Sequence, residues 1–103
     1  MKKTAFYSLI MQKGGPAAVL QNGYTDGTYN YYKRGAQWNA ILPAVGLSVC
    51  SEYTRKACAE KAHGAGMAER IAVAMERDGE TLRARFDKLV KEAESNENIT
   101  AAV

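Results

Sequence analysis

The chain has 103 residues and a formal net charge of +3, with 47% hydrophobic and 24% charged residues. This balance excludes a disordered or fibrous chain and predicts one globular domain. No run approaches the roughly 20 apolar residues of a membrane span. The opening "MKKTAFYSLIMQ" is too short and too polar in its middle for a secretory signal, so we expect a strand there and a cytoplasmic protein without membrane contact.

The first half of the chain carries the signals of strands and tight turns. Short β-favouring runs such as "TAFYSLIM", "AAVLQ" and "QWNAIL" end at glycine, proline or asparagine. The pair Asp26-Gly27 predicts a two-residue hairpin turn of type I′, which needs positive φ at both positions. We therefore expect an antiparallel β-meander of about four to five strands over residues 4–50.

Side-chain alternation assigns the aromatic residues of this half to the two faces of the sheet. Tyr29 and Tyr31 share one face. If Trp38, Ala40 and Leu42 line the core, these two tyrosines are their natural cross-strand partners. Tyr32 and Arg34 then point to the opposite face, which we expect to be exposed. Packing thus explains most of the aromatic residues and leaves Tyr32 as a candidate surface ring.

The second half has the 3.6-residue period of helices. Ser51 or Thr54 is the expected N-cap of a first helix, and Gly64 is its expected stop. Over residues 67–93 the apolar positions continue in phase through Asp78-Gly79. That phase admits one long, kinked helix, but the usual length of helices favours two that part at Asp78.

These elements predict a single α+β domain. Strands at about residues 4–50 are followed by two to three α-helices at about 54–93, packed on one face of the sheet, so the domain covers residues 1–93. Residues 94–103 lose the helical periodicity, and we expect a frayed or disordered tail there.

Residue types that carry catalytic or metal chemistry are scarce. Cys50, Cys58 and His63 match no zinc-ligand spacing, and a Cys-His nucleophile pair would need a third, orienting group. A disulfide between the two cysteines is sterically conceivable but unexpected in a reducing cytosol. The segment "QKGGPA" lacks the lysine and hydroxyl of a phosphate-binding loop, and no paired carboxylates indicate acid–base catalysis. We therefore expect no enzyme, no cofactor and no metal.

Positive charge and aromatic rings gather in the first half. Residues 1–50 carry five basic side chains against one acidic side chain, whereas residues 51–103 carry nine basic and ten acidic ones. Exposed rings beside Lys or Arg on a sheet are the pattern with which proteins bind single-stranded nucleic acid. The sequence therefore offers a weak nucleic-acid site with the candidates Tyr24, Tyr32, Lys33 and Arg34.

The helical half supports a different hypothesis, which we rank first. Its apolar stripe is long for so small a sheet to cover, and an uncovered part would seek a protein partner or a second copy of the chain. We thus expect protein–protein contact or self-association, with weak nucleic-acid binding as the alternative and a small enzyme without a recognisable motif as the third. The candidate residues for self-association are Met75, Leu82, Phe86 and Leu89.

Overall fold

The computed structural model describes the backbone of residues 1–102 and the side chains of residues 1–96. Five strands form one antiparallel sheet in the order β1-β2-β3-β4-β5, so the predicted meander and the α+β class are confirmed. The strands are β1 (Lys2–Gln12), β2 (Gly15–Thr25), β3 (Asn30–Arg34), β4 (Gln37–Leu42) and β5 (Leu47–Glu52). Two helices follow in the described chain, α1 (Arg55–Ala62) and α2 (Met67–Ala102).

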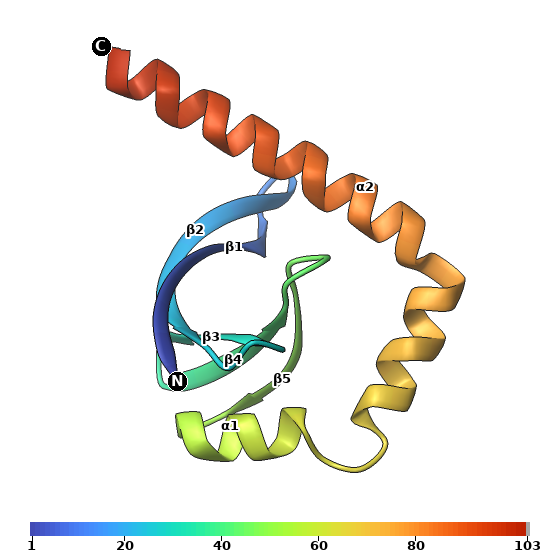
Figure 1. The fold of residues 1–103 in the computed structure, drawn as a ribbon. Coiled ribbons are helices and arrows are strands. Elements are labelled where there is room, and N and C mark those ends of the chain that lie inside the picture. Colours follow the sequence, from blue (N-terminus) through green and yellow to red (C-terminus); the bar gives the residue numbers. More distant parts are fainter. Residues whose placement is uncertain (103) are drawn as a thin grey trace.

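The sheet curls strongly, and the long hairpin of β1 and β2 makes most of the curve. These strands pair along their whole length, from Lys2 opposite Thr25 to Gln12 opposite Gly15. Figure 1 shows them arching back over the shorter strands, with α1 outside the curl. The Leu9 N–H donates a hydrogen bond of 2.9 Å to the carbonyl oxygen of Gly46, which ties β1 to the β4–β5 turn.

The turn between β2 and β3 differs from the predicted one. Of the two predicted turn residues, Gly27 has a positive φ of 90° and Asp26 does not, so the predicted type I′ turn at Asp26-Gly27 is wrong. The Asp26 N–H donates to the Tyr29 carbonyl oxygen, which leaves Gly27 and Thr28 in the centre of the turn. The carboxylate of Asp26 accepts hydrogen bonds from the N–H groups of Thr28 and Tyr29 at 2.9 and 2.8 Å. These side-chain hydrogen bonds satisfy the backbone N–H groups of the turn and place its centre one residue later than predicted.

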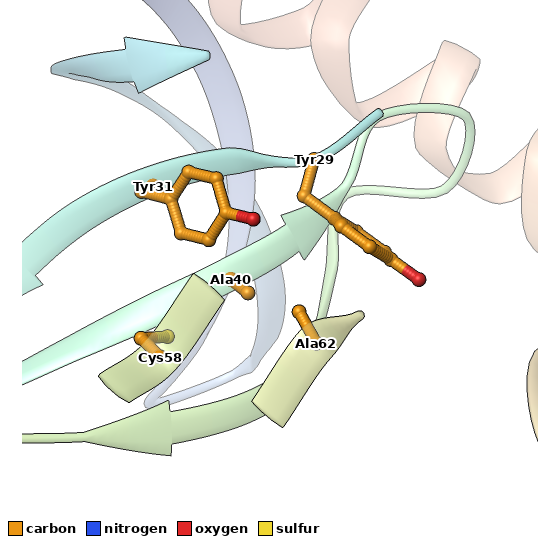
Figure 2. Close-up of a cluster of buried hydrophobic side chains, with 5 residues drawn as sticks. All are labelled: Tyr29, Tyr31, Ala40, Cys58 and Ala62. Carbon is orange, nitrogen blue, oxygen red and sulfur yellow. The ribbon is translucent and has the colours of Figure 1, made fainter. Parts of the chain in front are cut away.

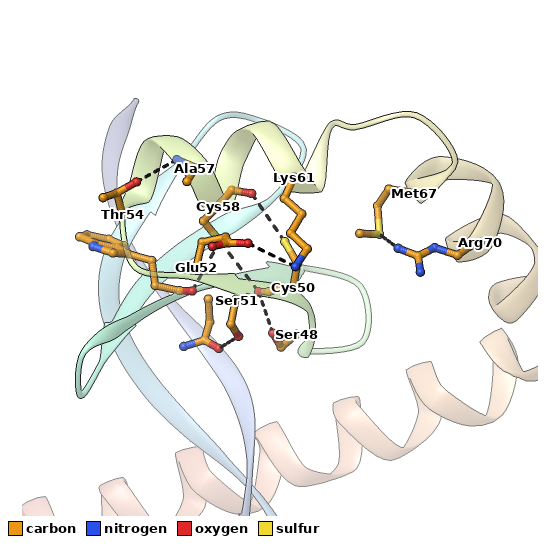
Figure 3. Close-up of polar contacts among 12 residues, drawn as sticks. Ser48, Cys50, Ser51, Glu52, Thr54, Ala57, Cys58, Lys61, Met67 and Arg70 are labelled. Atoms are coloured by element: carbon orange, nitrogen blue, oxygen red, sulfur yellow. Dashed lines mark hydrogen bonds and ion pairs between the residues drawn. The ribbon is translucent and has the colours of Figure 1, made fainter.

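A first core lies between the sheet and α1. Tyr31 stands opposite Ala40 in the register of β3 and β4, so the predicted sharing of one face is confirmed. Thr54 is the N-cap of α1 and accepts a hydrogen bond of 3.1 Å from the Ala57 N–H (Figure 3). Of the two expected N-cap residues, Ser51 and Thr54, the second is therefore confirmed. The small side chains of α1 let it approach the rings closely. The buried cluster (Figure 2) consists of Tyr29, Tyr31, Ala40, Cys58 and Ala62.

Tyr32, on the opposite face of β3, is also buried, which contradicts its expected exposure. Only 5% of Tyr32 is exposed. Its ring meets that of Phe6, from β1, edge-on with 6.0 Å between the ring centres. Ser8 and Ile41 are fully buried as well. Alternation correctly separates Tyr32 from Tyr31, but the curl of the long hairpin covers the second face.

Helix α2 is continuous, so the favoured split at Asp78 is wrong. Gly79 is buried within this helix. Figure 1 shows α2 bending where its colour passes from gold to orange. Helix α1 packs against β4 and β5, whereas α2 packs mainly against β2. The packing of the helices on one face of the sheet stays a prediction.

The expected frayed tail is described in part, its backbone to residue 102 and its side chains to residue 96. Helix α2 continues through residues 94–102, although the apolar periodicity has ended there. The side chains of residues 97–102 and the whole of residue 103 lie outside the described residues. A frayed or disordered tail over residues 94–103 therefore remains a prediction.

Candidate nucleic-acid interface

Two rings and one arginine stack on the sheet where α1 begins. The guanidinium carbon of Arg55 lies 4.2 Å from the centre of the Tyr24 ring and 5.8 Å from that of the Trp38 ring. The two ring centres are 6.1 Å apart, with the ring planes inclined by 47°. All three side chains are partly exposed. Contact of this kind favours a guanidinium parallel to the ring face, an orientation that leaves its N–H groups available along the edge.

Two lysines flank this stack. Lys3 lies opposite Tyr24 in the pairing of β1 with β2, and Lys33 lies opposite Trp38 in the pairing of β3 with β4. Residues directly opposite each other share a face of the sheet, so each lysine stands beside a ring. Both lysines are exposed. We call this set the basic-aromatic surface; it consists of Lys3, Tyr24, Lys33, Trp38 and Arg55.

The electrostatic balance of the basic-aromatic surface is positive. Its nearest acidic neighbour in the sheet register is Glu52, which lies opposite Trp38. An ion pair of 3.3 Å joins the Glu52 carboxylate to the Lys61 ammonium (Figure 3), so this negative charge is already offset. Within residues 1–96, no carboxylate forms an ion pair with Arg55. The surface can therefore attract a phosphate or another anion.

The structure keeps half of the predicted nucleic-acid residues together. Tyr24 and Lys33 both belong to the basic-aromatic surface. Tyr32 is buried on the other face, and Arg34, opposite Gln37 in the strand register, shares that other face. Arg34 is exposed, so only the expected exposure of Tyr32 is wrong, because the curl of the hairpin covers that ring. Binding of nucleic acid by these residues stays a prediction.

Sequence reasoning missed three members of this surface. Trp38 was expected to be buried; it packs against the edge of the α1 core but remains partly exposed. Arg55 is the first residue of α1, and only the packing of that helix brings it over the rings. Lys3 reaches the site through the register of β1 with β2. The alternation of Lys33 and Trp38 on neighbouring strands was the one signal that could have placed Trp38 beside a positive charge.

A second polar centre surrounds Asp26. Its Oδ2 accepts a hydrogen bond of 2.6 Å from the Tyr31 hydroxyl and lies 2.7 Å from His63 Nε2. Burial alone raises the pKa of Asp26, but the hydrogen bonds from the Tyr29 N–H, the Tyr31 hydroxyl, His63 and the Thr28 N–H outweigh it and lower the pKa well below 3.8. Burial, together with the hydrogen bond to this carboxylate, raises the pKa of Tyr31. The cluster fastens the β2–β3 turn to the end of α1.

Neither cysteine is placed for nucleophilic chemistry. Burial raises the pKa of Cys58 to about 12 and also raises the pKa of Cys50. The Cys58 thiol donates weakly to the Trp38 carbonyl oxygen at 3.6 Å, and the Cys50 thiol to the Cys58 carbonyl oxygen at 3.6 Å (Figure 3). A thiol that stays protonated is a poor nucleophile, so the buried Cys58 and the partly exposed Cys50 act as small packing groups.

The residues predicted for self-association divide between two roles. Phe86 is 9% exposed, and the ring lies so close to Gly46 that a Cβ added there would overlap it. Phe86 thus docks α2 on the β4–β5 turn within the chain. Met75, Leu82 and Leu89 are partly exposed, and self-association through them stays a prediction.

The described part of the chain holds neither a metal-ligand cluster nor a membrane-spanning helix. No group of three or more His, Cys, Asp or Glu side chains there could hold a metal ion. No helix among the described residues combines the length and apolar character that crossing a bilayer requires.

Comparison with known proteins adds no relative: no family model, no curated protein and no solved structure matches the chain. What the chain can bind therefore follows from the side chains described above.

Proposed function

We propose that the protein is a non-enzymatic binding protein that holds nucleic acid on its basic-aromatic surface. The observation that carries this proposal is the stacking of Arg55 on Tyr24 and Trp38, with Lys3 and Lys33 on the two sides. Proteins that bind single strands combine aromatic platforms for bases with basic groups that follow the phosphates. All of these elements occur here on one face.

The charge of the surface sets the expected strength of binding. Three basic groups, on Lys3, Lys33 and Arg55, can each neutralise a phosphate. Each contact with a single strand contributes roughly −0.7 to the log–log dependence of affinity on salt, so the slope should be about −2. Such binding is weak at physiological salt and measurable at low salt.

Self-association is supported less well by the geometry than by the sequence pattern. Phe86, at the centre of the proposed stripe, is used within the chain. Leu82 remains partly exposed on the same helix, so Leu82→Glu should lower the native mass in sedimentation if α2 joins two copies. A wild-type chain that stays monomeric at high concentration would remove this hypothesis.

Fluorescence anisotropy with a short labelled oligothymidylate tests the nucleic-acid proposal. The double variant Lys3→Gln/Lys33→Gln should bind more weakly and lower the salt slope by about 1.4. The matched control is Lys13→Gln/Lys88→Gln, which removes the same charge from two exposed positions outside the surface. The control should keep most of the affinity. Absence of binding at low salt, or equal losses in both double variants, would contradict the proposal.

A further inference from the structure

The basic-aromatic surface has a shape that restricts how a base can bind, and this inference rests on the proposed function. Its two ring centres are 6.1 Å apart and the ring planes are inclined by 47°. A base inserted between two rings would need parallel planes roughly 7 Å apart, because each stacking contact takes about 3.5 Å. Tyr24 and Trp38 therefore cannot enclose a base between them. A base can stack only on the outer side of one ring.

The position of Arg55 decides which ring is available. Its guanidinium lies 4.2 Å from the centre of the Tyr24 ring and so covers one face of that ring, whereas its distance to the Trp38 centre is 5.8 Å. We propose that the surface takes a single strand, with one base stacked on Trp38 and a neighbouring phosphate held by Arg55. Tyr24 acts as the support that keeps the guanidinium flat for a two-pronged contact with that phosphate.

The lysines extend this contact along the strand. Lys3 lies on β1 and Lys33 on β3, with β2 between them, so two interstrand steps of ~4.8 Å separate their strands. Lys33 also stands two residues along β3 from Tyr31, the residue opposite Tyr24, so the two lysine Cα positions would be roughly 12 Å apart in a flat sheet. At that separation the two ammonium groups can contact different phosphates of one strand. The surface thus accommodates a short stretch of single strand.

A duplex cannot use the same arrangement. Its bases are paired and stacked on one another, so none reaches Trp38, and only its phosphates can meet Lys3, Lys33 and Arg55. A duplex nevertheless has the higher charge density. Attraction by charge alone would therefore favour the duplex, whereas stacking on Trp38 favours the single strand. Whether the protein binds a single strand or a duplex more tightly therefore distinguishes stacking from attraction by charge alone.

The test compares three labelled probes in one titration series: an oligothymidylate, an abasic strand with the same number of phosphates, and a duplex of the same length. The full chain should bind the oligothymidylate about 5- to 150-fold more tightly than the abasic strand, which is the range for one stacked base. It should also prefer the oligothymidylate to the duplex.

Two variants locate the contacts. Trp38→Phe keeps a ring against the α1 core and should reduce the preference for bases, while unfolding curves check that the chain is still folded. Arg55→Lys keeps the charge and loses the flat fork, so it should weaken the oligothymidylate and the abasic strand by similar factors without changing the salt slope.

The possible outcomes test the single-strand inference separately from the proposed nucleic-acid function. Equal affinity for the abasic strand or for the duplex would overturn the single-strand inference and leave charge-driven nucleic-acid binding intact. An unchanged preference for bases in a folded Trp38→Phe variant would overturn the assignment of the platform to Trp38. Failure of all three probes to bind at low salt would overturn the proposed function itself.

Discussion

Replacing Asp26 with asparagine should lower the free energy of unfolding by about 2–4 kcal/mol at neutral pH. Asp26 Oδ1 accepts two backbone N–H groups, and Oδ2 accepts the Tyr31 hydroxyl and meets His63 Nε2. Asparagine has a single acceptor oxygen and cannot satisfy both pairs. A hydrogen bond to a charged group contributes roughly 1.5–3 kcal/mol, which applies to the buried Tyr31. The contact with His63, whose side chain is 47% exposed, adds only about 1 kcal/mol or less.

The same substitution should change how stability depends on pH. The hydrogen bonds outweigh burial and lower the pKa of Asp26 in the folded chain below 3.8, its ordinary value. Unfolding then takes up a proton at acid pH, so the contribution of Asp26 is complete above about pH 3.8 and is lost as the pH falls below that value. Asparagine does not titrate. The difference in stability between the two proteins should therefore be constant near neutral pH and narrow in acid.

Urea unfolding followed by circular dichroism at several pH values measures both effects. The control is Asp87→Asn, which removes an exposed carboxylate from α2 and should change stability by less than about 0.5 kcal/mol. If Asp26→Asn were as mild as this control, or if its cost were the same in acid as at neutral pH, the Asp26 carboxylate would not be the group that fastens the β2–β3 turn to α1.

Three further predictions concern the packing of the sheet and the thiols. Gly46→Ala should lower the free energy of unfolding by about 2–4 kcal/mol, because Gly46 has a φ of 71° and an added Cβ would overlap the Phe86 ring. Thermal unfolding measures this loss, and Phe86→Leu in the same chain should recover part of it. Strict additivity of the two changes would refute the contact. Gly23→Ala should weaken the protection of the β2 and β3 amides in hydrogen exchange, because the added Cβ would collide with the Tyr31 carbonyl oxygen. Unaltered protection would count against the close approach of Gly23 to Tyr31. Cys58, fully buried and with a pKa of about 12, should react with a thiol reagent at mildly alkaline pH only in denaturant, and equal rates in the folded chain would contradict its placement.

Local signals in the sequence were sufficient for the strands of the sheet and for the core under α1. Glycine and proline mark the turns, and period-two alternation places Tyr31 on the face of Ala40. Thr54 has the side chain that caps α1. Each of these features depends on residues close together in the chain, where propensity and alternation are decisive.

Features that depend on the curl of the sheet could not be predicted in this way. Alternation says that Tyr32 leaves the face of Tyr31, but only the three-dimensional curve of β1 and β2 brings Phe6 onto it. The candidate site likewise combines residues that the local sequence indicates with residues that only the three-dimensional fold brings together. Tyr24 and Lys33 were recognised from composition, whereas Arg55 joins them through the packing of α1, a contact between segments that are distant in sequence.

The most direct measurement of the central claim uses the intrinsic fluorescence of the chain. Trp38 is the single tryptophan, so its emission reports only on the proposed base platform. Titration of the unlabelled protein with oligothymidylate at low salt should quench this emission in a saturable way, and added salt should restore it, because the same basic groups hold the strand. Binding of the strand detected by anisotropy with no change in Trp38 emission would contradict the claim that a base stacks at this surface.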